Sequence, residues 1–394
     1  MSGGRPSQAV VVIGAGPAGL AAAYALRLAD VAVEIFERGP DQPLRLPETL
    51  YPAARAELAR LGVAAPPPLP SAVRLLSADG AVAVRLEVDA PMGLPAFDRA
   101  ALDLAFRDVV LSAGAAIYTG RSVTAVEPHA ERGWSIVDQA GARTETAVVV
   151  DASGKTALTS GKLIAVMTET AALDPRSSVF THYERTEPFG IDAVTLVADA
   201  GGFFYLVPLH ARRLCVGRVR YAEGKADSAA FDAAIEVSAP VRELVQGAVR
   251  VLPLIPAKNA ASRAIRAALP GLFVTGDALG FRDPFMWDGL HYALASGRAA
   301  GEWAAAVAQG RRNAAEAAAA YSVDLHNIEQ GVTVATEAAL APYAAALAPA
   351  MLLDPHMPPP LLAALLGLTR AETDAGAHWL LRQHRDDVAQ RRAA

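Results

Sequence analysis

A glycine-rich segment near the N-terminus has the residue types and the spacing to hold a phosphate group. It reads VVVIGAGPAGL over residues 10–20, so an apolar run is followed by Gly14, Gly16 and Gly19. Gly14 permits a tight turn, Gly16 lets backbone amides approach a pyrophosphate, and Gly19 lets a helix pack closely on its strand. The segment therefore predicts the strand, turn and helix that open a dinucleotide-binding unit.

A carboxylate follows at the spacing at which such units bind a ribose. Pro17 suits the first helical turn, where its missing N–H is no loss, and the helix is predicted over residues 17 to about 29. The run VAVEIFER predicts a second strand that ends in Glu37, eighteen residues beyond Gly19. A carboxylate there accepts hydrogen bonds from ribose hydroxyls and repels a 2′-phosphate. A lone GxGxxG motif is a weak signal, but the complete order of elements favours dinucleotide binding over a chance Gly-rich turn.

A second group of polar residues lies in GLFVTGDALGFRDPFMWDGLHYALASGRAAG, residues 271–301. The segment predicts a strand that delivers Asp277 at its carboxyl end, a loop, and a helix over residues 288 to about 309. His291 could act as a general base or proton relay, because the pKa of histidine moves easily across neutrality, or it could simply bond to backbone at the helix start. Asp288 is most simply the N-cap of this helix, and direct catalysis is the alternative.

Composition excludes several classes of function. Of the 394 residues, 53% are hydrophobic and 20% are charged, which is enough for a large core and two closely associated domains. The net charge is −5 and Lys and Arg form only short pairs, so no nucleic-acid surface is expected. Eight scattered His and one Cys show no metal-ligand spacing, so no metal site is expected.

Cysteine content and the apolar segments bear on location. The single cysteine, Cys215, cannot form an internal disulfide, and MSGGRPSQ does not resemble a signal peptide, so we expect a cytoplasmic protein with Cys215 as strand filler. The most apolar long stretch, residues 334–353, contains Glu337, Pro342 and Pro349. It is therefore a poor membrane span and a better docked helical segment, although a weak membrane contact stays open.

The remaining segments predict an α/β fold with a second, antiparallel sheet. An amphipathic helix is expected from about Glu48, and two strands near residues 72–77 and 81–88 are joined by a hairpin at Asp79-Gly80. Helix-then-strand periodicity returns over residues 97–120, and the strands SVTAVE, WSIVD and TAVVVDASG follow. Residues 178–220 carry four strands at hairpin spacing, SVFTHYER, DAVTLVAD, GGFFYLVPL and RRLCVGRVRY.

These elements predict a Rossmann-type nucleotide-binding domain assembled from residues 8–70, 98–175 and 258–325. Residues 71–97 and 176–257 would form the substrate-side antiparallel sheet, and residues 326–394 a helical C-terminal extension. Phe203 and Tyr205 should share one face of their strand, with Phe204 on the other. Phe203 and Tyr205 then either line a hydrophobic substrate cavity or belong to ordinary core packing.

Taken together, GAGPAGL, Glu37 and the GD segment at Asp277 resemble the FAD-dependent monooxygenase superfamily, which includes aromatic hydroxylases, flavin-dependent halogenases and geranylgeranyl reductases. The resemblance covers residues 8 to about 310 and implies a bound FAD. It implies that Asp277 holds the ribityl and pyrophosphate region, that Pro284 packs beside the flavin, and that the amides of residues 289–290 face its N1/O2 edge. The cofactor-binding positions that it implies are Gly14, Gly16, Pro17, Ala18, Gly19, Glu37, Arg38, Arg45, Arg99, Val123, Asp277, Pro284, Gly289 and Leu290. For Arg45, an exposed position without a phosphate contact is an equal alternative.

Three features separate the chain from the halogenase-like branch, to which PETL, DASGK and Leu290-His291 are similar. Halogenases carry a lysine that captures hypohalous acid, whereas no lysine occurs between residues 38 and 154. Their WxWxIP motif appears as FFYLVP, without either tryptophan. Asp288 lies where the family binds halide, and an ionised carboxylate would repel that ion. We therefore predict that the protein does not halogenate.

The resemblance implies a flavin monooxygenase of secondary metabolism. It would hydroxylate or epoxidise a hydrophobic, aromatic small molecule through a flavin C4a-hydroperoxide, with Phe203, Tyr205 and Trp287 contacting the substrate and His291 or Asp288 handling protons. NAD(P)H would be the ultimate electron donor, either directly or through a separate flavin reductase. The alternatives are a halogenase-like enzyme, a geranylgeranyl-reductase-like C=C reductase, and a degenerate flavin-binding protein without turnover.

Overall fold

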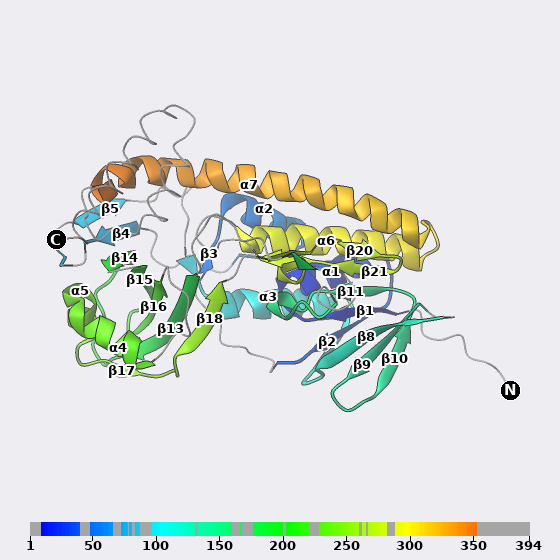
Figure 1. Cartoon of the computed structure of the whole chain (residues 1–394), viewed down its shortest axis with the longest axis horizontal. Coiled ribbons are helices and arrows are strands. Elements are labelled where there is room, and N and C mark those ends of the chain that lie inside the picture. The colour runs from blue at the N-terminus through cyan, green and yellow to red at the C-terminus, as the bar shows by residue number, and fades with distance from the viewer. Residues whose placement is uncertain are drawn as a thin grey trace.

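The computed structural model describes residues 9–39, 48–65, 72–77, 79–80, 83–86, 96–130, 133–159, 166–167, 176–199, 202–220, 228–259, 262–264, 267–281 and 288–352. Two sheets lie side by side, and helices run along them (Figure 1). The helices are α1 (Pro17–Leu28), α2 (Pro52–Arg60), α3 (Arg99–Ser112), α4 (Ser228–Val237), α5 (Ala239–Val245), α6 (Gly289–Ala308) and α7 (Ala314–Leu352).

The first sheet has six strands and contains the predicted dinucleotide-binding unit. Its order is β20-β21-β11-β1-β2-β7, with bounds β20 Ala268–Leu269, β21 Leu272–Val274, β11 Val149–Asp151, β1 Val10–Ile13, β2 Val33–Glu37 and β7 Ala116–Thr119. All neighbours pair in parallel except β20 with β21. β1, β11 and β21 are buried throughout and are apolar except for the terminal Asp151, as expected of strands covered on both faces. The predicted Rossmann-type α/β fold is confirmed.

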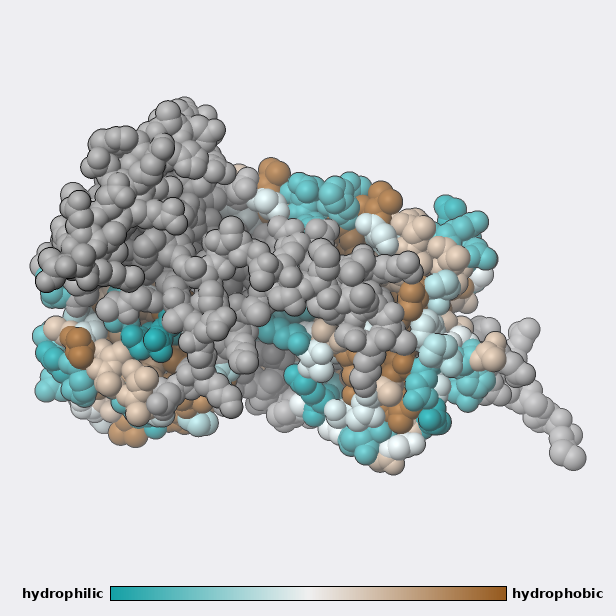
Figure 2. All heavy atoms as spheres, viewed as in Figure 1, coloured by the Kyte–Doolittle hydropathy of each residue, from teal (hydrophilic) through white to brown (hydrophobic). Residues whose placement is uncertain are grey.

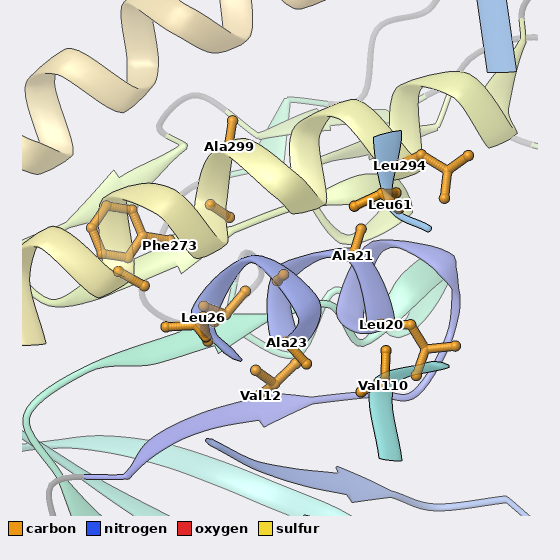
Figure 3. Close-up of a cluster of buried hydrophobic side chains, with 14 of the residues drawn as sticks. Val12, Leu20, Ala21, Ala23, Leu26, Leu61, Val110, Phe273, Leu294 and Ala299 are labelled. Atoms are coloured by element: carbon orange, nitrogen blue, oxygen red, sulfur yellow. The ribbon is translucent and has the colours of Figure 1, made fainter. Parts of the chain in front are cut away.

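Helix α1 lies between this sheet and α6 and packs unusually closely on α6 (Figure 3). A Cβ atom at Gly297 of α6 would lie 2.2 Å from the carbonyl oxygen of Ala18, and one at Gly301 would lie 2.3 Å from that of Ala22. Both contacts advance by four residues in the same direction, so the two helices run parallel. Their N-termini therefore point the same way.

The chain between β7 and β11 forms a small separate sheet. It consists of β8 (Val123–His129), β9 (Gly133–Asp138) and β10 (Arg143–Thr146), all antiparallel. Our single predicted strand TAVVVD is thus two elements, because Thr146 ends β10 and bonds through its hydroxyl to the carbonyls of Ala9 and Val148 before β11 begins. Three two- or three-residue strands, β12 (Val166–Met167), β19 (Ser262–Ala264) and β22 (Gly280–Phe281), form another small sheet.

The second large sheet has eight strands in the order β17-β13-β16-β15-β14-β4-β5, with β18 also on β13. The bounds are β4 Ala72–Leu76, β5 Ala83–Leu86, β13 Arg176–Glu184, β14 Ala193–Asp199, β15 Gly202–His210, β16 Arg213–Arg220, β17 Val249–Arg250 and β18 Ile255–Asn259. The β4–β5 hairpin and all four central strands occur as predicted. However, β13 pairs with β16 and not with its sequence neighbour β14, which instead pairs in parallel with β4.

The first part of the predicted helix after Glu48 is wrong. Glu48–Thr49 is the short strand β3, which pairs with β6 (Ala96–Phe97), and α2 begins only at Pro52. Proline is favoured at the first helical position and holds the residue before it in an extended conformation, as Tyr51 shows with a ψ of 150°.

Helix α7 has 39 residues and runs along both sheets (Figure 1). It contacts β20 and β21 of the first sheet and β5 of the second. Tyr321 is fully buried, donates a hydrogen bond to the carbonyl of Val274 over 2.7 Å, and packs edge-on to Phe273. The expected boundary at residue 326 lies inside this helix. Figure 2 shows a hydrophilic patch flanked by hydrophobic atoms at the upper edge of this face, and Val323 and Val334 of α7 are exposed. None of the described helices is long and apolar enough to cross a membrane.

Candidate functional site

Three loops converge at the carboxyl edge of the six-stranded sheet, after β1, β11 and β21. Gly14 has a φ of +100°, and a Cβ atom there would lie 2.4 Å from the carbonyl oxygen of Ala152. A Cβ atom at Gly276 would lie 2.8 Å from the Cβ atom of Ala18, at the start of α1. Ligands in open α/β sheets bind at this edge. The local motifs noted in the sequence are therefore brought to one place.

The start of α1 is built to receive an anion. Gly16 is its N-cap; α1 has no side-chain cap and no acidic residue in its first turn, so its first N–H groups keep their donor capacity. No described atom lies within 4 Å of where a Cβ of Gly16 would be, whereas a Cβ at Gly19 would lie 1.9 Å from the carbonyl oxygen of Gly14. Gly16 thus leaves room for a ligand, and Gly19 leaves room for the protein's own backbone.

Glu37 lies at the end of β2 beside this turn. One carboxylate oxygen accepts a hydrogen bond from the amide of Ala15 and the other from the amide of Gly39, each over 2.7 Å. A carboxylate has about four lone-pair sites, so it can still accept two hydroxyl groups. The neighbouring Arg38 instead donates to the hydroxyl of Thr156 over 2.8 Å.

The loop after β21 carries Asp277 and is fixed from α6. Asp277 lies half-buried in a short 3₁₀ turn, Gly276–Ala278. The hydroxyl of Ser296 accepts hydrogen bonds from the hydroxyl of Thr275 over 2.8 Å and from the amide of Gly276 over 3.2 Å. The charge of Asp277 acts on the ammonium group of Lys155, in the loop after β11. Sequence reasoning missed Ser296 and Lys155, because only the folded chain brings these segments together.

The loop after β11 is shaped by Asp151, which is fully buried. Its carboxylate accepts hydrogen bonds from the amide of Ser153 over 3.0 Å, and from the amide and hydroxyl of Thr159 over 2.9 and 2.5 Å. The buried carboxylate therefore fixes the loop at this strand end, where the sequence predicts a ligand.

Asp288 is the N-cap of α6. Its carboxylate accepts a hydrogen bond from the amide of His291 over 2.9 Å, and its own amide donates to the hydroxyl of Thr336 on α7 over 3.2 Å. Only 3% of Asp288 is exposed. The residue is therefore a helix cap, as the sequence predicts, and its direct catalytic role stays a prediction.

The His291 ring lies half-buried on the side of α6 that faces α2. Its Nδ1 atom is buried and has no hydrogen-bond partner among the described residues. Burial lowers the pKa of His291, the charge of Glu57 opposes this, and the charge of Arg60 adds to it. The ring is therefore neutral near pH 7 and keeps a free position for a proton.

The two helix N-termini are spaced along a common direction. Gly297 lies beside Ala18 in parallel helices, so α6 begins seven residues, or about 10 Å at a rise of about 1.5 Å per residue, beyond the start of α1. The amides of Gly289 and Leu290 have no hydrogen-bond partner among the described residues. The site therefore offers two positive helix ends to one extended ligand.

Other expected cofactor residues lie at the margin of this site. Arg99, the first residue of α3, forms an ion pair with Asp103 over 2.7 Å and is largely buried. Val123 begins β8 and packs against the apolar cluster that contains Ile13 and Phe36. The positions Arg45, Pro284 and Trp287 lie outside the described residues.

Tyr205 lies on the face of the eight-stranded sheet that points away from α4 and α5. Phe204 points to those helices, with its ring centroid 6.1 Å from that of Phe231, whereas Tyr205 packs with Phe180 and Cys215 on the other face. The ring of Tyr205 lies across Gly217, because a Cβ atom there would be 1.9 Å from the ring. Phe203 alternates onto the Tyr205 side of β15.

The comparisons with known proteins agree with this geometry. A family model described as FAD dependent oxidoreductase matches residues 34–307, more than half of the chain, and one described as NAD(P)-binding Rossmann-like domain matches residues 12–44. No curated protein matches the chain. Within the described residues, no group of His, Cys, Asp and Glu is placed to hold a metal ion.

Solved structures show the same fold at low identity. The flavin-dependent halogenase CmlS is 19% identical with a TM-score of 0.66, over 85% of this chain and 64% of that chain. The flavin-dependent brominase Bmp2 is 19% identical with a TM-score of 0.67, over 97% and 99%. The peptidyl tryptophan dihydroxylase QhpG is 19% identical with a TM-score of 0.63, over 84% and 75%. The chain thus spans less than two thirds of CmlS but nearly all of Bmp2.

Proposed function

Because the chain belongs to the family of FAD-dependent oxidoreductases, we propose that it is a flavin monooxygenase that hydroxylates or epoxidises a hydrophobic, aromatic small molecule. The observation that carries this choice of reaction is the buried carboxylate of Asp288 at the start of α6. In the halogenase-like branch a halide would bind near this position, where an ionised carboxylate would repel it, whereas the activation of O₂ needs no halide. NAD(P)H, used directly or through a separate flavin reductase, is the electron source in this proposal.

The residues at the sheet edge fit FAD. The first amides of α1 and the space at Gly16 suit the pyrophosphate, Glu37 keeps acceptor sites for the ribose, and Asp277 follows β21 at the same sheet edge. When bound and reduced, FAD supplies the activation of O₂ and the transfer of one oxygen atom. The six-stranded sheet with its helices would form the FAD domain, and the eight-stranded sheet the substrate side.

The chain's own groups have three tasks in this proposal. The amides of Gly289 and Leu290 stabilise negative charge on the reduced flavin ring, because a helix N-terminus favours an anion. The apolar face around Tyr205 positions the substrate and excludes water. His291 remains neutral because of its burial, so it can accept or hold a proton beside the ring.

Halogenation is the second candidate, because CmlS and Bmp2 share the fold. QhpG, a dihydroxylase, shares it equally, so the fold does not separate the two reactions. The absence of lysine between residues 38 and 154 opposes halogenation. An assay with reduced FAD, bromide and an electron-rich aromatic compound separates the two, because bromination gives a two-line isotope pattern in the product mass.

The test of the proposed reaction is the incorporation of ¹⁸O from ¹⁸O₂. The FAD-loaded protein is incubated with NAD(P)H and a panel of aromatic compounds, with and without an added flavin reductase. The masses of the products are then measured by mass spectrometry. A monooxygenase adds one labelled oxygen atom. A product that gains only hydrogen, without label, would assign the protein to a reductase on the same fold.

A proline at position 289 should weaken the stabilisation of reduced FAD without disturbing α6. Proline is tolerated at the first helical position, and Asp288, with a ψ of 83°, lies outside the helical region that a following proline disfavours. Because one N–H at the helix end is lost, we expect the two-electron midpoint potential to fall by about 10–20 mV. Gly289→Ala is the matched control, since it keeps the N–H and its Cβ meets no described atom within 4 Å. Equal potentials in all three proteins, measured by spectroelectrochemistry, would contradict the assigned position of this amide.

His291→Ala should keep FAD and lose product. If the neutral ring manages a proton in the reaction, its removal lowers turnover by about 10²-fold or more and diverts reducing equivalents to hydrogen peroxide. His326→Ala, at an exposed position of α7, is the control and should leave both quantities unchanged. Unchanged product and peroxide yields in the His291 variant would limit His291 to a role in packing.

A further inference from the structure

His182 is a buried polar residue on the face of the eight-stranded sheet that points away from α4 and α5. It lies on β13, where Val179 and Tyr183 point to the helix-covered core, so strand alternation directs Phe180 and His182 to the other side. Only 4% of His182 is exposed. Neither Nδ1 nor Nε2 of its ring has a hydrogen-bond partner among the described residues. Buried polar groups in folded proteins are nearly always paired, so we expect a group other than the described residues to pair with this ring.

The surroundings of the ring are an apolar wall, formed by two rows of paired residues. His182 pairs across the strands with Cys215, which pairs with Val207. The next row joins Phe180, Gly217 and Tyr205, and the ring centroids of Phe180 and His182 are 6.1 Å apart. We call these six residues the Tyr205 wall. His182 lies in the first of these rows, and its two ring nitrogens are unpaired within the described part of the chain.

Charged groups reach His182 from its own sheet and from the neighbouring layer. Burial lowers the pKa of His182 to about 4, and the charge of Arg213 acts in the same direction. The charges of Asp98 and Glu184 raise this pKa, but by less than burial lowers it. Asp98 is the N-cap of α3, outside the eight-stranded sheet, so His182 faces the side on which the FAD-binding layer lies. At neutral pH the ring is uncharged, with one nitrogen as donor and the other as acceptor.

We propose that His182 binds the substrate through a hydrogen bond to a hydroxyl group on the aromatic ring of the substrate. The Tyr205 wall then contacts that aromatic ring. A hydroxyl group both donates and accepts, and so matches an uncharged imidazole. A carboxylate would be repelled by Asp98 and Glu184 and would leave one ring nitrogen unmatched. The inference rests on the proposed function, since it names the substrate class of the same site as phenols or other hydroxylated rings.

The test compares two probes that differ only in this group. The FAD-loaded full chain is titrated with 4-methylphenol and with 4-methylanisole, and binding is followed by the flavin absorbance. We expect the wild type to bind the phenol at least about tenfold more tightly, because the ether cannot donate. His182→Leu should reduce the preference to about one, and His182→Gln, which keeps a donor and an acceptor, should retain part of it.

Tyr183→Phe is the matched control, since Tyr183 lies on the same strand and points to the helix-covered core, where Arg250 donates to its hydroxyl. The control should keep the full preference. In ¹⁵N spectra, the imidazole signal that disappears in His182→Gln should move with 4-methylphenol and stay fixed with 4-methylanisole. The inference is overturned by a wild type without preference, including one that binds neither probe, or by a preference that survives in His182→Leu. If only the monooxygenase proposal fails, the preference and the spectral shift persist while no product carries ¹⁸O.

Discussion

Alanine at position 19 is expected to destabilise the whole protein, whereas alanine at position 16 is expected to weaken only the binding of FAD. A Cβ at Gly19 would lie 1.9 Å from the carbonyl oxygen of Gly14 and 3.0 Å from its carbonyl carbon. These are backbone atoms of a turn that is itself fixed by the positive φ of Gly14 and by its packing on Ala152. Relief requires α1 to move from the sheet, at a cost of about 3 kcal/mol or more, a large part of a typical stability of about 5–15 kcal/mol.

Gly16 is the internal control for this prediction. Its Cβ would meet no described atom within 4 Å, so Gly16→Ala should change the free energy of unfolding of the FAD-free protein by less than about 1 kcal/mol. If the pyrophosphate fills that space, the affinity for FAD should fall by about 100-fold, which corresponds to about 2.7 kcal/mol. Urea unfolding without FAD and titration with FAD measure the two quantities. Full FAD affinity in Gly16→Ala would contradict a pyrophosphate at the start of α1.

Acid is expected to destabilise the protein through His182 before most carboxylates are protonated. The pKa of His182 is lowered from 6.5 to about 4 in the folded protein. As the pH falls below about 6.5, His182 therefore becomes protonated in the unfolded chain but stays neutral in the folded protein. The free energy of unfolding decreases until the pH passes about 4. The full loss is about 3 kcal/mol, and about 2 kcal/mol of it falls between pH 7 and pH 5.

The measurement is urea unfolding of the FAD-free protein at several pH values. His182→Leu should flatten the decrease between pH 7 and pH 5, and His326→Leu, at an exposed position of α7, should leave it unchanged. Because burial also lowers the pKa of His291, that residue adds a decrease of the same sign, and the His182 and His291 double variant should be the flattest. An equal decrease in wild type and His182→Leu would show that the ring is protonated within the fold.

Sequence patterns located the cofactor side of the site because its signals are local. Gly14, Gly16 and Gly19 act within one turn, and the cap at Asp288 follows from the residue and the helix that it begins, so the predicted start of α6 agrees with the structure. The helix expected from Glu48 was wrong at its start, because a strand partner at residues 96–97 is invisible to local periodicity. The roles of residues at both sites stay predictions.

The substrate side was less accessible to sequence reasoning because it depends on strand pairing. Equal spacing of four strands suggested consecutive hairpins, yet β13 joins the sheet beside β16. That pairing places His182 opposite Cys215 and two strands from Val207. In the sequence, His182 is one polar residue in SVFTHYER, and its isolation becomes apparent only when both neighbouring strands and their side chains are in place.

Helix α7 makes the two sheets one mechanical unit. At a rise of about 1.5 Å per residue, its 39 residues form a strut of about 58 Å that is attached to β20 and β21 at one end and reaches β5 towards the other. A hinge motion that separated the sheets would have to bend this strut. Its attachment through Thr336 to the amide of Asp288 means that such bending would also pull on the start of α6. Entry of a substrate by opening of the sheets would therefore disturb the helix end proposed to hold the flavin, so the fold favours entry through movements of loops and side chains.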